Sequence, residues 1–295
     1  STPLYSSAAS DVYKRQDLNY VVNTGTPPFQ YVDWPEKEHE AQPPTYESHR
    51  CLIKDGRPKV AELALETYGF KFMKHESRVD DFYNTNQVSK IYDDEVGSII
   101  KSELEASRVI VFDHTFRTVN KKVSTEKNTR APVKAVHNDY TDRSARQRVQ
   151  DLLSKNDADR ILKNRFAIVQ TWRPINHPVI SEPLAMCDGR TIPDSGFVPL
   201  QRRYKHRTAE TYHISYDPKH HWYYFPEMTP DELIMFKFFY SRPLINETLF
   251  LVHIAFDLYT AIKKSTEIIA PEGIVTHIGY RLNKKILSLM YLLLA

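Results

Sequence analysis

The residues best suited to chemistry in this sequence are a histidine and an aspartate separated by one position. His137 and Asp139 lie at the start of the stretch Ala135–Val149. Side chains of an extended strand alternate between its two faces, so an imidazole and a carboxylate two positions apart point the same way. With one further histidine from a distant strand, three ligands would cap one face of a metal. Positions would remain open for a chelating substrate and for dioxygen, as in non-heme Fe(II) oxygenases.

The alternative interpretation of His137 and Asp139 is purely structural. A histidine at the edge of a loop often pairs with a nearby carboxylate, and the two-residue spacing occurs by chance. The pattern alone therefore predicts half of a metal site, and the elements around it must supply the rest.

The composition indicates a folded globular protein. The chain has 295 residues, of which 41% are hydrophobic and 12% aromatic, enough for a substantial core. Glycine is scarce, at 8 residues, while Tyr and Phe are abundant, which favours strands and ordered loops. A formal charge of +3 and a pI near 8.6 give no electrostatic footprint for nucleic acid or a membrane. No apolar run reaches the length of a transmembrane helix.

The cysteines indicate the redox compartment of the protein, and the first residues indicate whether a signal peptide is present. Cys51 and Cys187 neither frame a disulfide scaffold nor have the spacing of a zinc finger, so we expect a reducing compartment, the cytoplasm. Residues 1–16 are small and polar, without a starting Met or the apolar core of a signal peptide. We expect them to be a non-native tail that lies outside the fold.

The first half of the chain predicts short helices and a few strands. The predicted helices are 61–68 (ended by Gly69), 80–105 and 142–153. The predicted strands are 18–22, 70–73 and 108–117, the last of them apolar enough to be central in a sheet. The connections are an extended arm over 24–48 and an exposed basic loop over 118–130.

The second half has the pattern of an antiparallel β fold, with short aromatic or β-branched runs broken by proline. The predicted strands are 166–172, 210–216 and 221–225. Thr229 and Pro230 match the start of a helix, so we expect a helical turn that feeds a strand within 233–240.

Several segments, taken together, resemble the fungal hydroxylase/desaturase family that includes gibberellin desaturase-like proteins and relatives of the cephamycin C-7 hydroxylase. In family order they are Gly69-Phe70, Arg108–Arg117, Val136–Tyr140, Val169–Ile175, Glu182–Asp188 and His221–Glu232. The resemblance implies a mainly β chain with flanking helices, in the α+β class, around a double-stranded β-helix (jelly-roll) core. It also implies an oxidation that depends on Fe(II), 2-oxoglutarate and O2.

On this resemblance we expect one oxygenase-like domain over 17–295. Its expected parts are an N-terminal arm with helices at 17–107, the jelly-roll core at 108–260 and a divergent C-terminus at 261–295. The family's terminal segment, which supplies an arginine for the co-substrate, is not recognisable in the divergent part.

The resemblance also implies a set of metal ligands. His137 and Asp139 match the family's first two iron ligands, and the family's distal histidine matches His253 in the segment Val252–Phe256. His221 is the competitor for the distal position, although the aromatic residues beside it favour a packing role.

Two arginines are candidates for holding the co-substrate carboxylate. Arg281 is the only arginine that follows His253, and Arg173 lies on a strand that could line the pocket. For Arg173 the alternative interpretation is a buried salt bridge to Asp188 or Glu182.

Trp172 and Tyr223 are the expected substrate-pocket residues, whereas His213 and His220 are expected to be surface or sheet residues. The resemblance implies hydroxylation or desaturation of a small secondary metabolite. The alternatives are a catalytically impaired jelly roll that binds a small molecule or a protein, and a metal-dependent hydrolase. The hydrolase is disfavoured because no base carboxylate or second metal site is evident. The sequence predicts neither the substrate nor the oligomeric state.

Overall fold

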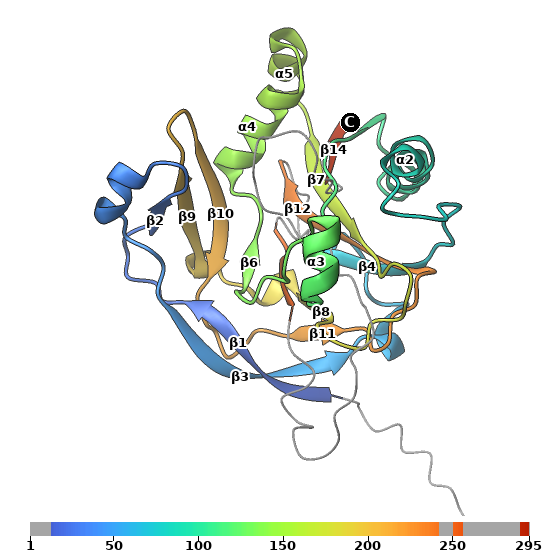
Figure 1. The fold of residues 1–295 in the computed structure, drawn as a ribbon, viewed down its shortest axis with the longest axis horizontal. Coiled ribbons are helices and arrows are strands. Elements are labelled where there is room, and N and C mark those ends of the chain that lie inside the picture. The colour runs from blue at the N-terminus through green and yellow to red at the C-terminus, as the bar shows by residue number, and fades with distance from the viewer. Residues whose placement is uncertain (1–12, 242–249, 256–289, 295) are drawn as a thin grey trace, which may run out of the picture.

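A computed structural model describes residues 13–241, 250–255 and 290–294 of the chain (Figure 1). Residues 1–12 of the expected tail and most of the expected divergent C-terminus, including Arg281, lie outside the described residues. Residues 13–16, however, belong to the fold, which corrects part of that expectation. They begin strand β1 (Tyr13–Val21), which pairs antiparallel with β3 (Tyr46–Asp55) along its whole length.

The larger of two sheets has nine strands in the order β1-β3-β11-β8-β13-β6-β10-β9-β2. The remaining strands of this sheet are β2 (Phe29–Tyr31), β6 (His137–Asn138), β8 (Leu184–Cys187), β9 (Phe197–Arg203), β10 (Thr208–Ile214), β11 (Trp222–Tyr224) and β13 (Val252–Ala255). Most neighbours are antiparallel, whereas β11 pairs parallel with β3 and β2 pairs parallel with β9.

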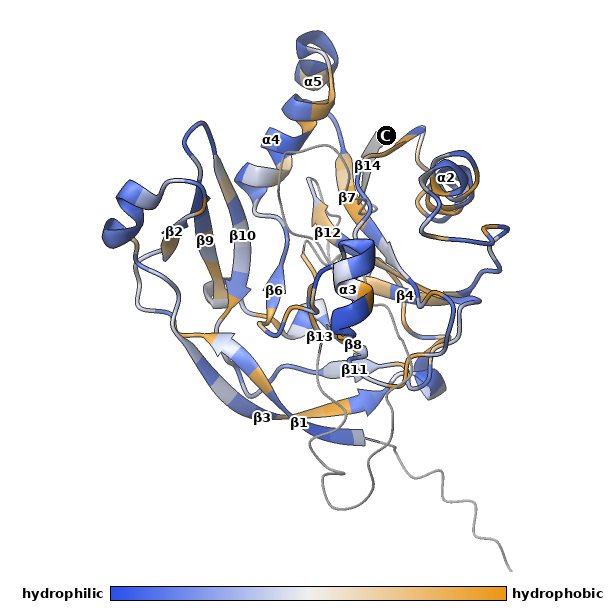
Figure 2. Cartoon of the chain, in the orientation of Figure 1, coloured by the Kyte–Doolittle hydropathy of each residue, from blue (hydrophilic) through white to orange (hydrophobic). Residues whose placement is uncertain are grey.

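The smaller sheet has five strands in the order β4-β12-β7-β14-β5. Their bounds are β4 (Phe70–Lys74), β5 (Arg108–Val111), β7 (Phe166–Trp172), β12 (Glu232–Tyr240) and β14 (Met290–Leu294). All seven residues of β7 are buried. Strands covered on both faces lose the alternation of apolar and polar residues, which explains the continuous apolar run. In Figure 2 much of β7 and β12 carries the hydrophobic colour.

The two sheets face each other across the main hydrophobic core. Phe70, Phe166 and Phe236 from the smaller sheet pack in one cluster with Leu184 and Met186 from the larger sheet. The structure is therefore a β-sandwich of the jelly-roll type, mainly β, with the helices on its outside (Figure 1). This fold class agrees with the expectation from the sequence.

The helices flank the sandwich. The longer ones are α2 (Asp93–Glu103), α4 (Asp142–Leu152) and α5 (Lys155–Leu162), and the shorter ones are α1 (Thr85–Gln87), the π-helix η3 (Val88–Tyr92) and α3 (Lys121–Lys127). Short 3₁₀ helices are η1 (Pro35–Glu40), η2 (Arg57–Lys59), η4 (Gly189–Thr191) and η5 (Asp194–Gly196). Val96 and Ile100, one turn apart on α2, pack against Val169 and Met235 on the outer face of the smaller sheet. No helix among these residues combines the length and the apolar character needed to cross a bilayer.

Two predicted connections differ from the structure. Residues 61–68 form a series of turns in place of the expected helix. A helix is costly to nucleate, and so short a stretch needs tertiary support to persist. Conversely, the expected loop over 118–130 contains α3. The side chain of Asn120 caps this helix by accepting hydrogen bonds from the backbone N–H groups of Lys122 and Val123.

Two strand predictions also need correction. Residues 232–240 form a strand throughout, without the expected helical turn, because both faces of β12 are covered. The segment 108–117 is a strand only as far as Val111, and it lies at the end of the smaller sheet instead of its centre. Residues 112–116 lie outside the strands of the sheet.

Candidate metal centre

Three neighbouring strands of the larger sheet position the candidate ligands. β6 lies between β13 and β10, and His137 is in register with His253 on one side and with His213 on the other. Val252 and Ile254 pack in the cluster beneath the larger sheet. His253 therefore points to the opposite, inner face, where its ring lies 5.3 Å from that of Phe236 and 5.6 Å from that of Phe238.

The side chains of His137, Asp139 and His253 converge in the interior of the sandwich. One ligand atom from each lies within 4.8 Å of the other two. Asp139 Oδ1 is 3.7 Å from His137 Nε2, and Asp139 Oδ2 is 3.7 Å from His253 Nε2. All three are buried, with exposed fractions of 4%, 3% and 0% respectively. Donor atoms so spaced can surround one metal ion at ordinary bond lengths.

The imidazoles are held in the neutral form that binds metals. His137 Nδ1 lies 2.7 Å from the carbonyl oxygen of Ala135, to which it donates its hydrogen, so that Nε2 is left to face Asp139. Burial lowers the pKa of His137 to about 3, and burial also lowers the pKa of His253 well below its ordinary value. Neutral imidazole nitrogens and a carboxylate are the donor set of a catalytic metal site.

The charged form of the buried Asp139 carboxyl group is unfavourable without a cation nearby. Burial raises its pKa to about 7, although the positive charges of Arg117 and Arg202 act in the opposite direction. Its Oδ2 atom has no hydrogen-bond partner among the described residues. A divalent cation between Asp139, His137 and His253 would compensate this buried charge, so the residues present fit a metal ion.

The structure adds two residues beside the centre that the sequence did not single out for this site. The ring of His213 lies 6.0 Å from that of His137, and its Nδ1 is 2.9 Å from the Tyr46 hydroxyl. His213 is thus a buried residue of the sheet and not a surface residue, although the sequence allowed for both. Arg117 is also buried, and its positive charge acts to lower the pKa of Asp139. His213 lies here because β10 pairs with β6. The two strands are far apart in the sequence, so no local pattern predicts this pairing.

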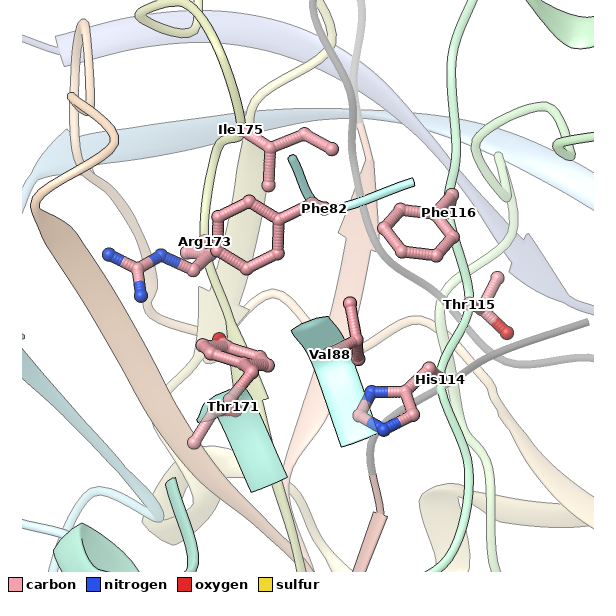
Figure 3. Close-up of a pocket in the computed structure, with 9 residues that line it drawn as sticks. Phe82, Val88, His114, Thr115, Phe116, Thr171, Arg173 and Ile175 are labelled. Atoms are coloured by element: carbon pink, nitrogen blue, oxygen red, sulfur yellow. The ribbon is translucent and has the colours of Figure 1, made fainter. Parts of the chain in front are cut away.

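Figure 3 shows Arg173 in a separate pocket, with its guanidinium directed away from His114 and Thr115. This guanidinium donates to the carbonyl oxygens of Pro230 and His75 and lies over the rings of Phe82 and Tyr92. The expected salt bridge of Arg173 is wrong. Asp188 pairs with Arg190, and Glu182 pairs with Lys134.

The remaining sequence candidates are placed as follows. Trp172 is buried in the core between the sheets, and the ring of Tyr223 packs against those of Tyr68 and Phe70. Their assignment to a substrate pocket stays a prediction. His221, the competitor for the distal position, is exposed, and His220 Nδ1 lies 3.2 Å from the hydroxyl of Tyr20. Neither belongs to the group of converging ligands.

Comparisons with known proteins identify the family of this chain and several relatives. A family model described as "Oxidoreductase/YMDC permease-like domain" matches residues 18–268. The hydroxylase/desaturase efuI of Hormonema carpetanum is 29% identical over 67% of this chain and 73% of its own. The α-ketoglutarate-dependent dioxygenase phiK of a fungal species is 30% identical over 65% of this chain and 71% of its own. The Fe(II)/2-oxoglutarate-dependent dioxygenase nvfI of Aspergillus novofumigatus is 30% identical over 64% of this chain and 69% of its own.

Among solved structures, the iron and alpha-ketoglutarate-dependent endoperoxidase NvfI has a similar fold. It superposes with a TM-score of 0.77 and 22% sequence identity, covering 96% of this chain and 98% of that chain. The likeness supports the jelly-roll assignment.

Proposed function

The chain belongs to the oxidoreductase family whose fungal members include hydroxylase/desaturases and Fe(II)/2-oxoglutarate-dependent dioxygenases, and from this premise we propose that His137, Asp139 and His253 hold its ferrous ion. The observation that carries the proposal is the convergence of these three side chains. His137 lies on β6, Asp139 follows that strand, and His253 lies on the neighbouring strand β13. Two imidazole nitrogens and one carboxylate form the facial triad of non-heme Fe(II) oxygenases.

Each residue of the triad has a distinct task. A ferrous ion, with 2-oxoglutarate and dioxygen, supplies oxidising power for unactivated C–H bonds, which no amino-acid side chain provides. The lowered pKa values of His137 and His253 keep their lone pairs ready for a metal. The hydrogen bond to Ala135 fixes which nitrogen of His137 is the ligand. Burial of all three residues keeps bulk water away from the centre.

A small organic molecule of the kind that fungal secondary metabolism produces is the proposed substrate, and hydroxylation or desaturation is the proposed outcome. The names of the relatives support this choice, because they are hydroxylase/desaturases and dioxygenases from fungi. The endoperoxidase among the solved structures shows that the same fold also serves another oxidation.

The proposal includes a cytoplasmic location without nucleic acid or a membrane as partner. It is supported by two buried cysteines that form no disulfide, Cys51 and Cys187, and by a formal charge of only +3. Fractionation of the cells that make the protein tests the location, and recovery in the membrane pellet would contradict it.

Absorbance spectroscopy of the purified protein tests the metal centre. Under anaerobic conditions with Fe(II), addition of 2-oxoglutarate should produce a weak metal-to-ligand charge-transfer band. The band should disappear in His137→Ala, which removes a ligand, and persist in His221→Ala, which removes an exposed histidine outside the triad. Absence of the band in the intact protein would contradict the oxygenase assignment. It would favour the alternative, a jelly roll that only binds small molecules or proteins.

A further inference from the structure

The hairpin formed by β9 and β10 extends the inner face of the larger sheet beyond the proposed metal ligands. β10 lies between β6 and β9 and pairs antiparallel with both (Figure 1). His213 on β10 lies opposite His137, and their rings are 6.0 Å apart. Side chains two positions apart on a strand share a face, so Thr211 points to the same inner face as His213. It lies about 7 Å from His213 along the strand.

Thr211 is a buried residue whose hydroxyl group is unused. The residue is 5% exposed, and its Oγ1 atom has no hydrogen-bond partner among the described residues. Its neighbour across the hairpin is Leu200, which is also buried. A buried hydroxyl group is normally hydrogen-bonded. The unused Oγ1 atom therefore indicates that a polar group of a ligand binds at this point of the inner face.

Arg202 adds a positive charge beside Thr211. It follows Leu200 by two residues, so it shares the inner face of β9 and lies diagonally across the hairpin from Thr211. Diagonal neighbours of this kind are about 7–8 Å apart, within the reach of a long side chain. Arg202 is half-buried, and no carboxylate in the described part of the chain forms an ion pair with it. Glu210, on the other face of β10, pairs instead with Arg143.

The charge of Arg202 also acts on a residue beyond the hairpin, Tyr46. Burial raises the pKa of the Tyr46 hydroxyl to about 12, and the positive charge of Arg202 acts in the opposite direction. This hydroxyl lies 2.9 Å from Nδ1 of His213. The interaction agrees with the strand register, which places Arg202 on the same face as His213.

Apolar side chains cover the inner face between Arg202 and His213. Val198 lies opposite His213, and Ala209 lies opposite Arg202. Together with Leu200 they are 1–7% exposed. A ligand held at Arg202 and Thr211 by an anionic group would therefore meet an apolar surface on the side of the triad.

We propose that Arg202 and Thr211 bind a carboxylate group of the organic substrate, whose apolar skeleton lies over Val198 and Leu200. The inference rests on the proposed function, since it concerns the substrate of that reaction. A guanidinium offers two parallel donors that match the two oxygens of a carboxylate, and the Thr211 hydroxyl adds a third donor. The substrate class is an apolar carboxylic acid that is oxidised at a carbon remote from its acid group.

Calorimetric titration without oxygen tests the proposal on the Fe(II)-loaded protein, saturated with 2-oxoglutarate so that the probes do not compete for the metal. The probes are octanoate and octanamide, which share an apolar chain and differ in the charge of the end group. The intact protein should bind octanoate about 10- to 100-fold more tightly, as expected for hydrogen bonds to a charged group. Arg202→Gln should abolish this preference, leave the affinity for octanamide unchanged and keep the charge-transfer band.

Thr211→Val is the second variant, and it retains the shape of the side chain without the hydroxyl. It should weaken octanoate binding about 3- to 10-fold. The fold should persist, because the hydroxyl has no hydrogen bond to lose among the described residues. The matched control is Arg203→Gln. Arg203 is the next residue on β9 and points to the other face, where its guanidinium carbon lies 3.6 Å from the centre of the Phe29 ring. This variant should keep the full preference for octanoate.

Three results would overturn the inference. Equal affinities for the two probes, in an intact protein that shows the charge-transfer band, would exclude the carboxylate site and leave the proposed function standing. A preference that survives in Arg202→Gln would place the carboxylate elsewhere. Loss of the band in Arg202→Gln would make Arg202 a residue of the co-substrate site. An intact protein without the band would instead contradict the proposed function, on which the inference rests.

Discussion

At the scale of single residues, Asn138 connects the segments that carry the proposed metal ligands. Its side-chain amide donates to the carbonyl oxygens of Phe238 and Leu251, at 3.0 and 2.6 Å, and its Oδ1 accepts from the Tyr140 N–H at 2.7 Å. Asn138 is fully buried. It thereby joins β6 to β12 of the opposite sheet and to the residue before β13, and it shapes the turn that carries Asp139.

Replacement of Asn138 by Ala should therefore destabilise the protein strongly. Two carbonyls and one N–H would lose their buried partner, so we expect the free energy of unfolding to fall by about 2–4 kcal/mol. Urea denaturation measures this difference. Asn164→Ala is the control, because Asn164 makes one exposed hydrogen bond to the Arg160 carbonyl and its loss should cost less than about 0.5 kcal/mol. Equal losses in the two variants would contradict this account of Asn138.

Asp113 makes stability depend on pH. Burial raises the pKa of its carboxyl group to about 6, with Arg148 and Arg130 acting in the opposite direction. The folded state therefore binds this proton more tightly than the unfolded state. The carboxyl group costs no stability below its unfolded pKa of about 4, and its destabilising effect grows until the pH passes the folded value.

Asp113→Asn should remove this effect. Relative to the intact protein, the variant should be equally stable near pH 4 and more stable at pH 8, by roughly 1–3 kcal/mol. Chemical denaturation at several pH values measures the difference. A variant that is destabilised at pH 8 would show that the charged carboxylate is favourable in the folded state.

At the scale of elements, the start of α4 fixes the end of the segment that carries the proposed ligands His137 and Asp139. Thr141 Oγ1 accepts from the Ser144 N–H at 3.0 Å, and Ser144 Oγ accepts from the Thr141 N–H at 2.9 Å, which is a capping box. The Thr141 hydroxyl also donates to Glu210 on β10, at 3.1 Å. The helix is thus anchored to the larger sheet two residues after Asp139.

Thr141→Ala should weaken both the helix and the metal centre. We expect a loss of about 1–3 kcal/mol in the free energy of unfolding and a lower affinity for Fe(II), because Asp139 is held less firmly. Ser154→Ala removes the N-cap of α5, where Ser154 Oγ accepts from the Asp157 N–H. It should cost about 1 kcal/mol and leave the affinity unchanged. Identical Fe(II) affinities in the two variants would show that the start of α4 does not contribute to Fe(II) binding.

Some elements were predictable from local sequence and others were not. The continuous apolar run of β7 indicates a buried strand, and the alternation of apolar and polar residues in β4 is visible at once. β6 is only two residues long, so it has no period of its own and exists because β13 and β10 flank it. α3 buries a single residue, Val123, and its amphipathic pattern is correspondingly faint.

The site shows the same division. His137 and Asp139 stand out as a local motif, and His253 follows from the resemblance to a family. Arg117 lies in a segment that reads as an ordinary strand. Only the tertiary structure shows that its guanidinium is buried, with Nε and Nη2 lacking a hydrogen-bond partner among the described residues.

At the scale of the whole molecule, the two sheets are joined at one end by a paired charge. Arg57 follows β3 of the larger sheet, and Glu232 begins β12 of the smaller one. Their contact is bidentate, with Nη1–Oε1 and Nη2–Oε2 distances of 2.8 Å each, and Arg57 also donates to the Pro226 carbonyl. The carboxylate is 6% exposed, so it depends on this partner.

Arg57→Ala should leave that carboxylate buried without its cation. We expect the free energy of unfolding to fall by about 2–4 kcal/mol, whereas Arg50→Ala, which breaks an exposed pair with Asp17, should change it by less than about 1 kcal/mol. Thermal and urea unfolding of the two variants measure the contrast. Similar small losses would mean that the sheets are held together by the apolar core alone.

The register between β6 and β13 constrains how the chain can vary. His253 faces His137 directly, so a single residue inserted or deleted within Val252–Ala255 would rotate the histidine to the outer side of the sheet. The length of the connection between the two strands is not bound by this condition. A distant homologue is therefore better recognised by whether the histidine that matches His253 faces the inner side of its own strand than by a fixed number of residues between it and the first ligand.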